Sequence, residues 1–177
     1  YTDSSCPSLL LEPQSTNLLE YSEDFSDSYW AKLGSGTGSV AIVTSDYAIS
    51  PDGTQNASRL QCNLGGGTSS SSQSLIYDEV IVSAGDTTRS IYVKSNDSNT
   101  YDVYFGATLS SYEIKEVTSE WTRIDATRNV ASGADYLTIG LRGGTGSGDT
   151  ADILIYGAQV EEQSYATSYI PTNGAIA

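Results

Sequence analysis

The sequence predicts an all-β protein, an antiparallel β-sandwich of about nine or ten short strands. No segment of helical length keeps a helical period, whereas short runs of alternating apolar and polar residues recur along the chain. The stretches between these runs are rich in Gly, Ser, Asn and Asp, which favour turns. Because the alternation leaves one wet face per sheet, it favours a sandwich over a barrel. The 177 residues are expected to form one domain, 1–177, with its own core.

The N-terminal section is predicted to lie at the periphery of this sandwich. Pro7 and Pro13 bracket the apolar run Leu9–Leu11. Proline fixes φ and has no N–H to donate, so it is disfavoured in a central strand. We therefore expect residues 1–16 to form an N-terminal arm or an edge strand.

The middle of the chain alternates between turns and strands. Leu33–Ser39 has the composition of a Gly/Ser turn, Ser50–Gly53 is a Pro-Asp-Gly turn, and Asn63–Ser72 is a flexible loop of low complexity. The expected strands are Val40–Thr44, Ala57–Cys62, Ser74–Val82, Thr88–Ser95, Tyr101–Thr108, Tyr112–Val117, Trp121–Thr127 and Tyr136–Arg142.

The last strand and the C-terminal tail need cover from elsewhere in the chain. Ile153–Tyr156 has the composition of a buried strand, and the apolar pair Tyr169–Ile170 lies further on, before Pro171. The apolar runs of Ser8–Trp30 are the obvious source of that cover. We expect the two ends of the chain to be neighbouring strands that close the domain.

Charge argues against two classes of partner. The chain has 8 Lys and Arg against 22 Asp and Glu, a formal net charge of −14. A surface this negative repels phosphate backbones and anionic lipids, so binding to nucleic acid and to membrane surfaces is disfavoured. No run of apolar residues is long enough for a membrane span, so membrane insertion is not predicted.

The residue inventory offers little catalytic chemistry. There is no histidine, which removes Ser–His–Asp and Cys–His nucleophile systems. Glycoside hydrolysis needs only a pair of carboxylates, so the sequence leaves that activity open. It also leaves open whether Cys6 and Cys62 form a disulfide bond. A set of four acidic residues could supply oxygen ligands for calcium, namely Glu23, Asp24, Asp27 and Asp52. The favoured interpretation is that these residues form a solvated acidic loop.

Strand alternation indicates where a ligand could bind. Ile91 and Val93 are expected to point into the core, which turns Tyr92 and Lys94 outward. The same reasoning turns Tyr104 and Asp102 outward from Tyr101–Thr108, and Arg142 outward from Tyr136–Arg142. If these strands share a sheet, its open face carries a set suited to sugars, with aromatic rings for stacking and polar groups for hydroxyls. The alternative is that each tyrosine only stabilises its strand.

Five blocks of sequence resemble a module that recurs in bacteriophage tail-fibre and other virion-surface proteins. Their order and spacing match over nearly the whole chain. The blocks are CPSLLLEPQSTNLLEYSEDFSDSYW at 6–30, SPDGTQNASRL at 50–60, SIYVKS at 90–95, EWTRI at 120–124 and IYGAQVEEQSYATSYIPT at 155–172. The resemblance implies a jelly-roll β-sandwich similar to carbohydrate-binding modules and concanavalin-like lectins.

The resemblance also implies a function and a setting. It points to a non-catalytic, glycan-adhesion module at a virion surface or outside the cell, binding a polysaccharide or cell-surface glycan, with a homotrimer within a fibre or decoration as one possible assembly. An architectural virion domain without glycan binding is the alternative, and a polysaccharide-degrading enzyme or its appended module is a weaker one. A sugar platform would leave Tyr92 and Tyr104 exposed, whereas an architectural domain would cover them.

Related modules often hold a structural calcium ion. Its ligands are a carboxylate after the Phe of the first strand and an Asp in the last strand. Ser26 follows Phe25 here, and Tyr156–Gly157 stands where the Asp would fall. No cofactor is therefore predicted, and a structural calcium is left open.

Overall fold

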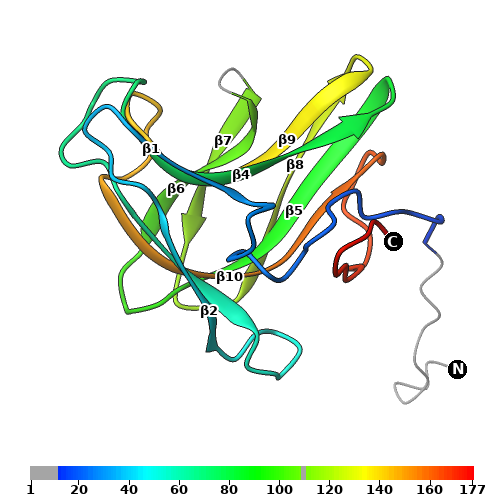
Figure 1. Cartoon of the computed structure of the whole chain (residues 1–177), viewed down its shortest axis with the longest axis horizontal. Helices are drawn as coiled ribbons and strands as arrows, with labels where there is room; N and C mark the ends of the chain where they lie inside the picture. The colour runs from blue at the N-terminus through cyan, green and yellow to red at the C-terminus, as the bar shows by residue number, and fades with distance from the viewer. Residues whose placement is uncertain (1–11, 109–110) are drawn as a thin grey trace, which may run out of the picture.

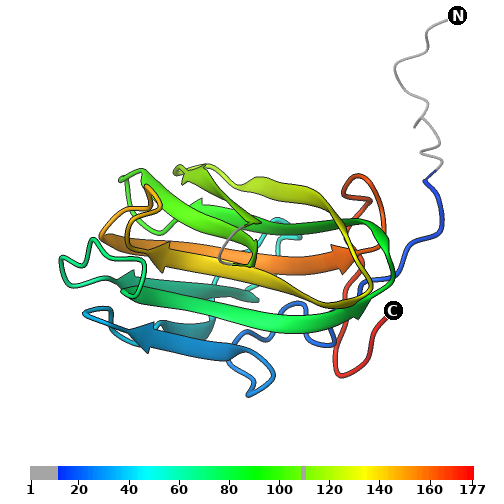
Figure 2. The same cartoon turned by 90° about the horizontal axis from the view of Figure 1, so that it is seen from above.

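The fold is a sandwich of two antiparallel sheets. The computed structural model describes residues 12–108 and 111–177, and none of them lies in a helix. Sheet 1 has the strand order β1 (Ala31–Ser35), β4 (Gln73–Val82), β9 (Gly133–Arg142), β6 (Tyr101–Thr108) and β7 (Ser111–Val117). Sheet 2 has the order β2 (Ile42–Ala48), β3 (Ala57–Asn63), β10 (Thr150–Glu161), β5 (Gly85–Ser95) and β8 (Thr122–Val130). Figures 1 and 2 show the two layers.

The structure confirms the predicted β-sandwich, and most strands lie where alternation placed them. The exception in the middle of the chain is β1, which occupies residues predicted to be a turn. Its glycine explains why composition was misleading. A Cβ on Gly34 would lie 2.3 Å from the Val40 nitrogen, so the strand needs glycine for a close backbone approach.

The core lies between the sheets and is apolar, with one ionic exception. Ile76, Phe105 and Ile139 of sheet 1 are fully buried in the same core cluster as the inward side chains of sheet 2. Inside this layer, Arg89 of β5 donates to Asp135 of β9 at 2.8 Å, and both side chains are almost completely buried. Because an unpaired buried charge is strongly unfavourable, this pair favours the observed alignment of the two sheets.

The N-terminal section is a neighbour of the last strand, as predicted, but it is not a strand itself. Apart from one isolated bridge, residues 12–30 have no strand assignment. The Leu18 N–H donates to the Val160 carbonyl, and the Ala158 N–H donates to the Ser22 carbonyl. This section therefore runs beside the C-terminal half of β10, and its Trp30 joins the core.

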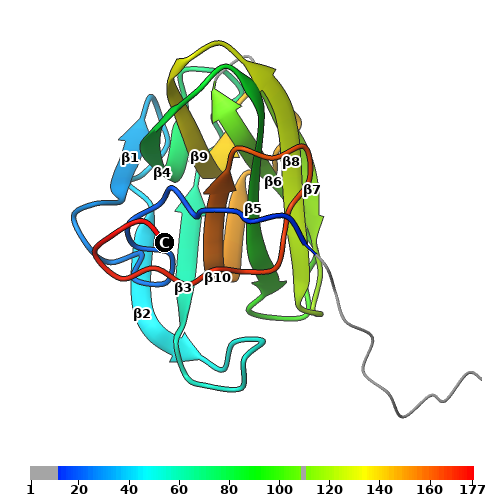
Figure 3. The ribbon, with the colours of Figure 1, turned by 90° about the vertical axis from the view of Figure 1, so that its right-hand side faces the viewer.

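The C-terminal tail also lacks strand structure and crosses the outer face of sheet 2. Figure 3 shows the N-terminal section and the tail passing in front of β10 and β5. The Ile170 N–H donates to the Gln159 side chain, and the Thr167 N–H donates to Glu161. The outward polar side chains of β10 are thus occupied by the tail.

The predicted N-terminal arm and the possible bond between Cys6 and Cys62 both involve residues outside the described part of the chain. The Leu9–Leu11 run and Cys6 lie outside the described residues. The Cys62 thiol is free and buried, and burial raises its pKa to about 12. No helix in the described part of the chain is long and apolar enough to cross a membrane.

Candidate functional site

A groove lies on the outer face of sheet 1, over strands β4, β9 and β6. It has a volume of about 210 Å³ and an apolar lining with polar tips. Alternation within β4 and β9 selects most of the lining, because the neighbours in sequence point into the core. Ala107 is the exception, since it lies at a register shift in β6. The residues are Leu33, Gln73, Leu75, Tyr77, Tyr104, Ala107, Tyr136 and Thr138.

Two half-buried tyrosines form one wall of the groove. The rings of Tyr77 and Tyr136 meet edge to face with 6.3 Å between their centroids. The Tyr136 hydroxyl donates to the Glu79 carboxylate, and this hydrogen bond raises the pKa of Tyr136. The wall therefore offers ring surface for stacking together with a hydroxyl and a carboxylate that can bond to ligand hydroxyls.

A glycine of β9 lies between two residues that line the groove. Gly140 of β9 is paired with Leu75 on one side and Tyr104 on the other. A Cβ there would lie 2.5 Å from the Leu75 Cα atom, and φ is +147°. Only glycine allows β4 to approach this closely.

Tyr104 closes the opposite wall but does not present an open ring face. It is 1% exposed, and its ring stacks on Tyr112 with 4.8 Å between centroids. Burial raises the pKa of Tyr104, while the nearby Arg142 guanidinium opposes that rise. Tyr104 and Arg142 thus form a positioned polar pair, and Tyr77 and Tyr136 supply the accessible rings.

The five residues predicted as one site do not share a face, so that expectation is wrong. Tyr104, Asp102 and Arg142 lie in sheet 1, as predicted, whereas Tyr92 and Lys94 lie on β5 in sheet 2. Alternation correctly turned each side chain out of the core. It could not show that β5 and β6 belong to opposite sheets.

Tyr92 lies beneath the C-terminal tail. Its ring centroid is 6.4 Å from that of Tyr169 and 6.1 Å from that of Tyr156. The Arg123 guanidinium lies over the Tyr92 ring at 5.5 Å. Protein atoms therefore occupy the surroundings of Tyr92 in place of a ligand.

The acidic residues near Phe25 do not fit a calcium ion. The Glu23 carboxylate accepts hydrogen bonds from Tyr169 at 2.9 Å, Asn56 at 3.1 Å and Tyr156 at 3.2 Å. Tyr156 also donates to Asp52. Protein donors thus occupy oxygens that a metal would need, and the described residues contain no cluster of metal-ligating side chains.

Comparison with solved structures shows the fold family of the sandwich. No protein-family model matches the sequence, and no curated protein matches it either. The tandem CBM22-1–CBM22-2 domain of Xyn10C from Paenibacillus barcinonensis aligns with TM-score 0.50 and 18% identity, covering 86% of this chain and 46% of that one. The CBM22-1 xylan-binding domain of the same protein aligns with TM-score 0.49 and 17% identity, covering 86% and 95%. The alignment with the tandem domain shows that the chain shares its jelly-roll fold.

Sequence reasoning missed the two accessible tyrosines of the groove. Tyr136 could have been found, because Leu137 and Ile139 alternate as apolar core residues of the predicted strand and Tyr136 has the opposite parity. Tyr77 follows in the same way from the buried Ile76. Leu33 had no such signal, since β1 was not expected to be a strand.

Proposed function

We propose that this chain is a non-catalytic carbohydrate-binding module that binds a polysaccharide or cell-surface glycan in the groove of sheet 1. The observation that carries the proposal is the uncovered wall of Tyr77 and Tyr136, combined with polar groups at its tips. Ring faces stack on the C–H face of a pyranose, and the polar tips bond to its hydroxyls. The jelly-roll fold shared with carbohydrate-binding modules supports the proposal.

Each groove residue has a defined part in the proposed complex. Tyr77 and Tyr136 provide the stacking surface. Gln73 and Thr138 supply hydrogen-bonding groups beside them, and Glu79 orients the Tyr136 hydroxyl. Among the residues first expected to bind sugar, Tyr104 lines the groove and Arg142 interacts with it. Asp102, on the same strand as Tyr104, also stays in the proposal. Tyr92 and Lys94 belong to the other sheet.

A glycan array followed by titration calorimetry tests the proposal. A shallow groove of this size should bind in the micromolar to millimolar range, roughly −4 to −8 kcal/mol. Tyr77→Ala and Tyr136→Ala should each weaken binding by about fivefold or more, as expected for aromatic contacts at a small interface. Tyr165→Ala is the matched control, because Tyr165 is 48% exposed and lies in the tail. Silence across neutral and acidic glycans, or equal losses in the control, would reject the groove as a glycan site.

The enzyme alternative has its own test. New reducing ends after long incubation with the glycan that binds would show hydrolysis. The proposed module should bind without producing them.

A virion-surface setting is a separate proposal that rests on the sequence resemblance. An exposed apolar edge favours the architectural alternative within that setting. Val40, Ile42 and Ile49 are 56%, 59% and 62% exposed, and they lie on or beside the edge strand β2. Exposed apolar residues on an edge strand favour protein contacts. Analytical ultracentrifugation tests the architectural alternative. A stable trimer that dissociates when Ile42 is replaced by a charged residue would favour assembly through β2.

A further inference from the structure

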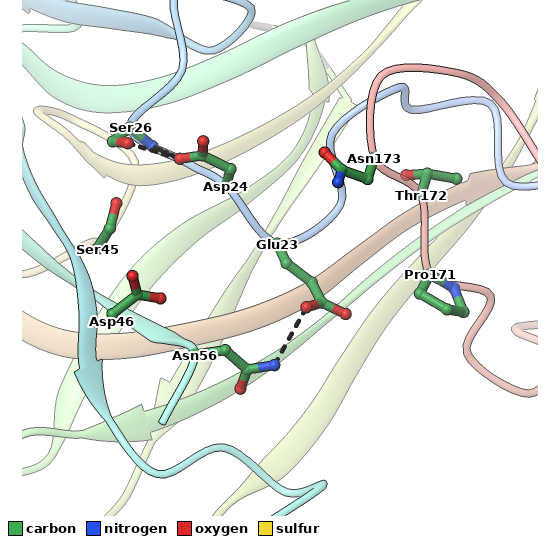
Figure 4. A pocket seen from close by; sticks show the side chains of 9 residues that line it. All are labelled: Glu23, Asp24, Ser26, Ser45, Asp46, Asn56, Pro171, Thr172 and Asn173. Carbon is green, nitrogen blue, oxygen red and sulfur yellow. Dashed lines mark hydrogen bonds between the residues drawn. The ribbon is translucent and has the colours of Figure 1, made fainter. Parts of the chain in front are cut away.

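A second hollow lies on the other side of the molecule, at the edge of sheet 2. It is formed by the N-terminal section, the β2–β3 hairpin and the C-terminal tail, and its volume is about 500 Å³ (Figure 4). This is within the range of about 300–1,000 Å³ typical of small-molecule sites. The residues are Glu23, Asp24, Ser26, Ser45, Asp46, Asn56, Pro171, Thr172 and Asn173, together called the acidic pocket.

The lining of the acidic pocket is anionic. It contains three carboxylates, Glu23, Asp24 and Asp46, and neither Lys nor Arg. Glu23 accepts three hydrogen bonds from protein donors, and one oxygen of Asp24 accepts those of the following turn. The described residues donate no hydrogen bond to the Asp46 carboxylate, which points toward the hollow in Figure 4. The pocket therefore has free anionic acceptors.

Thr172 provides a second, independent observation. It is only 7% exposed, and the described part of the chain gives its hydroxyl no hydrogen-bond partner. The backbone of Thr172 is fixed on both sides by Ser22. In Figure 4 the Thr172 hydroxyl faces the other lining residues, while its methyl group faces away. A buried hydroxyl without a partner is unfavourable, so a ligand that bonds to it would gain affinity.

The chemistry of the pocket selects a class of ligand. Carboxylates without basic partners attract a cation, but the described acids do not converge as a metal site. The remaining lining consists mainly of hydroxyl and amide groups, which suit a polyhydroxylated molecule. We propose that the acidic pocket binds an amino sugar through its primary ammonium group. The ammonium lies against Asp46 and Asp24, and the sugar hydroxyls bond to Thr172 and its polar neighbours.

Three monosaccharides distinguish the ammonium from the sugar ring. In an NMR titration, glucosamine should shift the amide signals of residues 45–46 and 172–173. Because a hydrogen-bonded charge gains more than a neutral group, it should bind about tenfold more tightly than glucose or N-acetylglucosamine. Lysine amide is a fourth probe, which should bind less tightly than glucosamine because it lacks hydroxyls. Equal binding of N-acetylglucosamine, or tighter binding of lysine amide, would overturn the proposal.

Two variants locate the site. Asp46→Asn removes a charge, and asparagine tolerates the left-handed backbone found there, where φ is +50°. It should weaken glucosamine binding about threefold to fivefold, the effect of one exposed ion pair. Glu120→Gln is the matched control, since Glu120 is exposed and lies outside the pocket. Thr172→Val should also weaken binding, and thermal unfolding should show that it leaves the fold intact.

The alternatives give distinct outcomes. If calcium chloride perturbs the same signals at lower concentration than glucosamine, the site is a metal site and the proposal fails. Equal losses of affinity in the Asp46 and Glu120 variants would indicate long-range charge alone, and would also overturn it. Tyr77→Ala should leave the glucosamine affinity read from the amide signals of residues 45–46 and 172–173 unchanged, because Tyr77 lines the groove and not the acidic pocket. A failed groove and a failed acidic pocket can therefore be told apart.

Discussion

The outer faces of the two sheets differ, although each sheet has five strands and a similar inner face. Sheet 1 leaves a groove open over β4, β9 and β6. On sheet 2 the C-terminal tail crosses β10 and β5, and its Thr167 carbonyl accepts a hydrogen bond from Arg123 of β8. The groove on one face is therefore open, whereas the chain's own end covers β10 and β5 on part of the other face.

Tyrosines on the two faces show what this difference means chemically. Tyr77 and Tyr136 keep part of their rings open to solvent. Burial raises the pKa values of Tyr156 and Tyr169, whose hydroxyls donate to Glu23. The same residue type thus serves binding on one face and stability on the other. What lies over a tyrosine decides between the two roles.

The largest effect should come from breaking the contact between the N-terminal section and the covered face. Asn17 is fully buried, donates to the Ala158 and Ile170 carbonyls, and accepts from the Leu19 and Val160 N–H groups. Asn17→Ala leaves these groups without partners, so unfolding in urea should show a loss of about 3 kcal/mol. Asn129→Ala, at an exposed position, should cost less than about 0.5 kcal/mol. Similar losses in both would contradict the structural role of Asn17.

The next effect concerns the fit of the tail on β10. Gly157 has φ of +63°, and a Cβ there would lie 3.2 Å from the Tyr169 ring. Gly157→Ala should cost about 2 kcal/mol, from the left-handed backbone and displacement of the ring. Gly53→Ala is the matched control, since φ is +88° and no atom lies within 4 Å of its Cβ position. If thermal unfolding gives equal losses for the two variants, contact with Tyr169 contributes nothing.

Removing one tyrosine hydroxyl on each face should affect stability differently. Tyr169→Phe removes the hydroxyl that bonds to Ser22 and Glu23, and should cost about 1–2 kcal/mol because those groups are partly buried. Tyr136→Phe removes only an exposed bond to Glu79 and should stay within about 0.5 kcal/mol. Denaturant unfolding measures both. A larger loss for Tyr136→Phe would reverse the assignment of structural and binding faces.

The smallest effect lies on the part of sheet 2 that the tail leaves uncovered. Arg59 of β3 donates two hydrogen bonds to Asp152 of β10, and they hold the pKa of Asp152 below its usual value. The lowered pKa means that this stabilisation is present above the unfolded pKa of about 3.9 and is lost as pH falls through the folded value. Asp152→Asn should therefore cost up to about 1 kcal/mol at neutral pH and almost nothing near pH 2. A loss that persists at low pH would show that charge is not its cause.

Local periodicity predicted most of the strands and the inward or outward direction of most side chains. Alternation placed Ile91 and Val93 in the core and turned Tyr104 outward, because successive side chains of a strand point to opposite sides. It failed at Ala31–Ser35, where a close backbone approach and not an apolar pattern makes the strand. Strand positions could be predicted because they depend on local periodicity.

Local periodicity does not show which strands share a sheet or which face stays open, because both depend on contacts made in the folded chain. Consecutive strands β5 and β6 lie in opposite sheets, so Tyr92 and Tyr104 point away from each other's face. The cover over Tyr92 comes from Tyr169, far along the chain. Periodicity predicts to which side of its own sheet a side chain points. Which strands pair, and which segment covers a face, depends on contacts between residues distant in sequence. The groove and the acidic pocket both arise from such contacts.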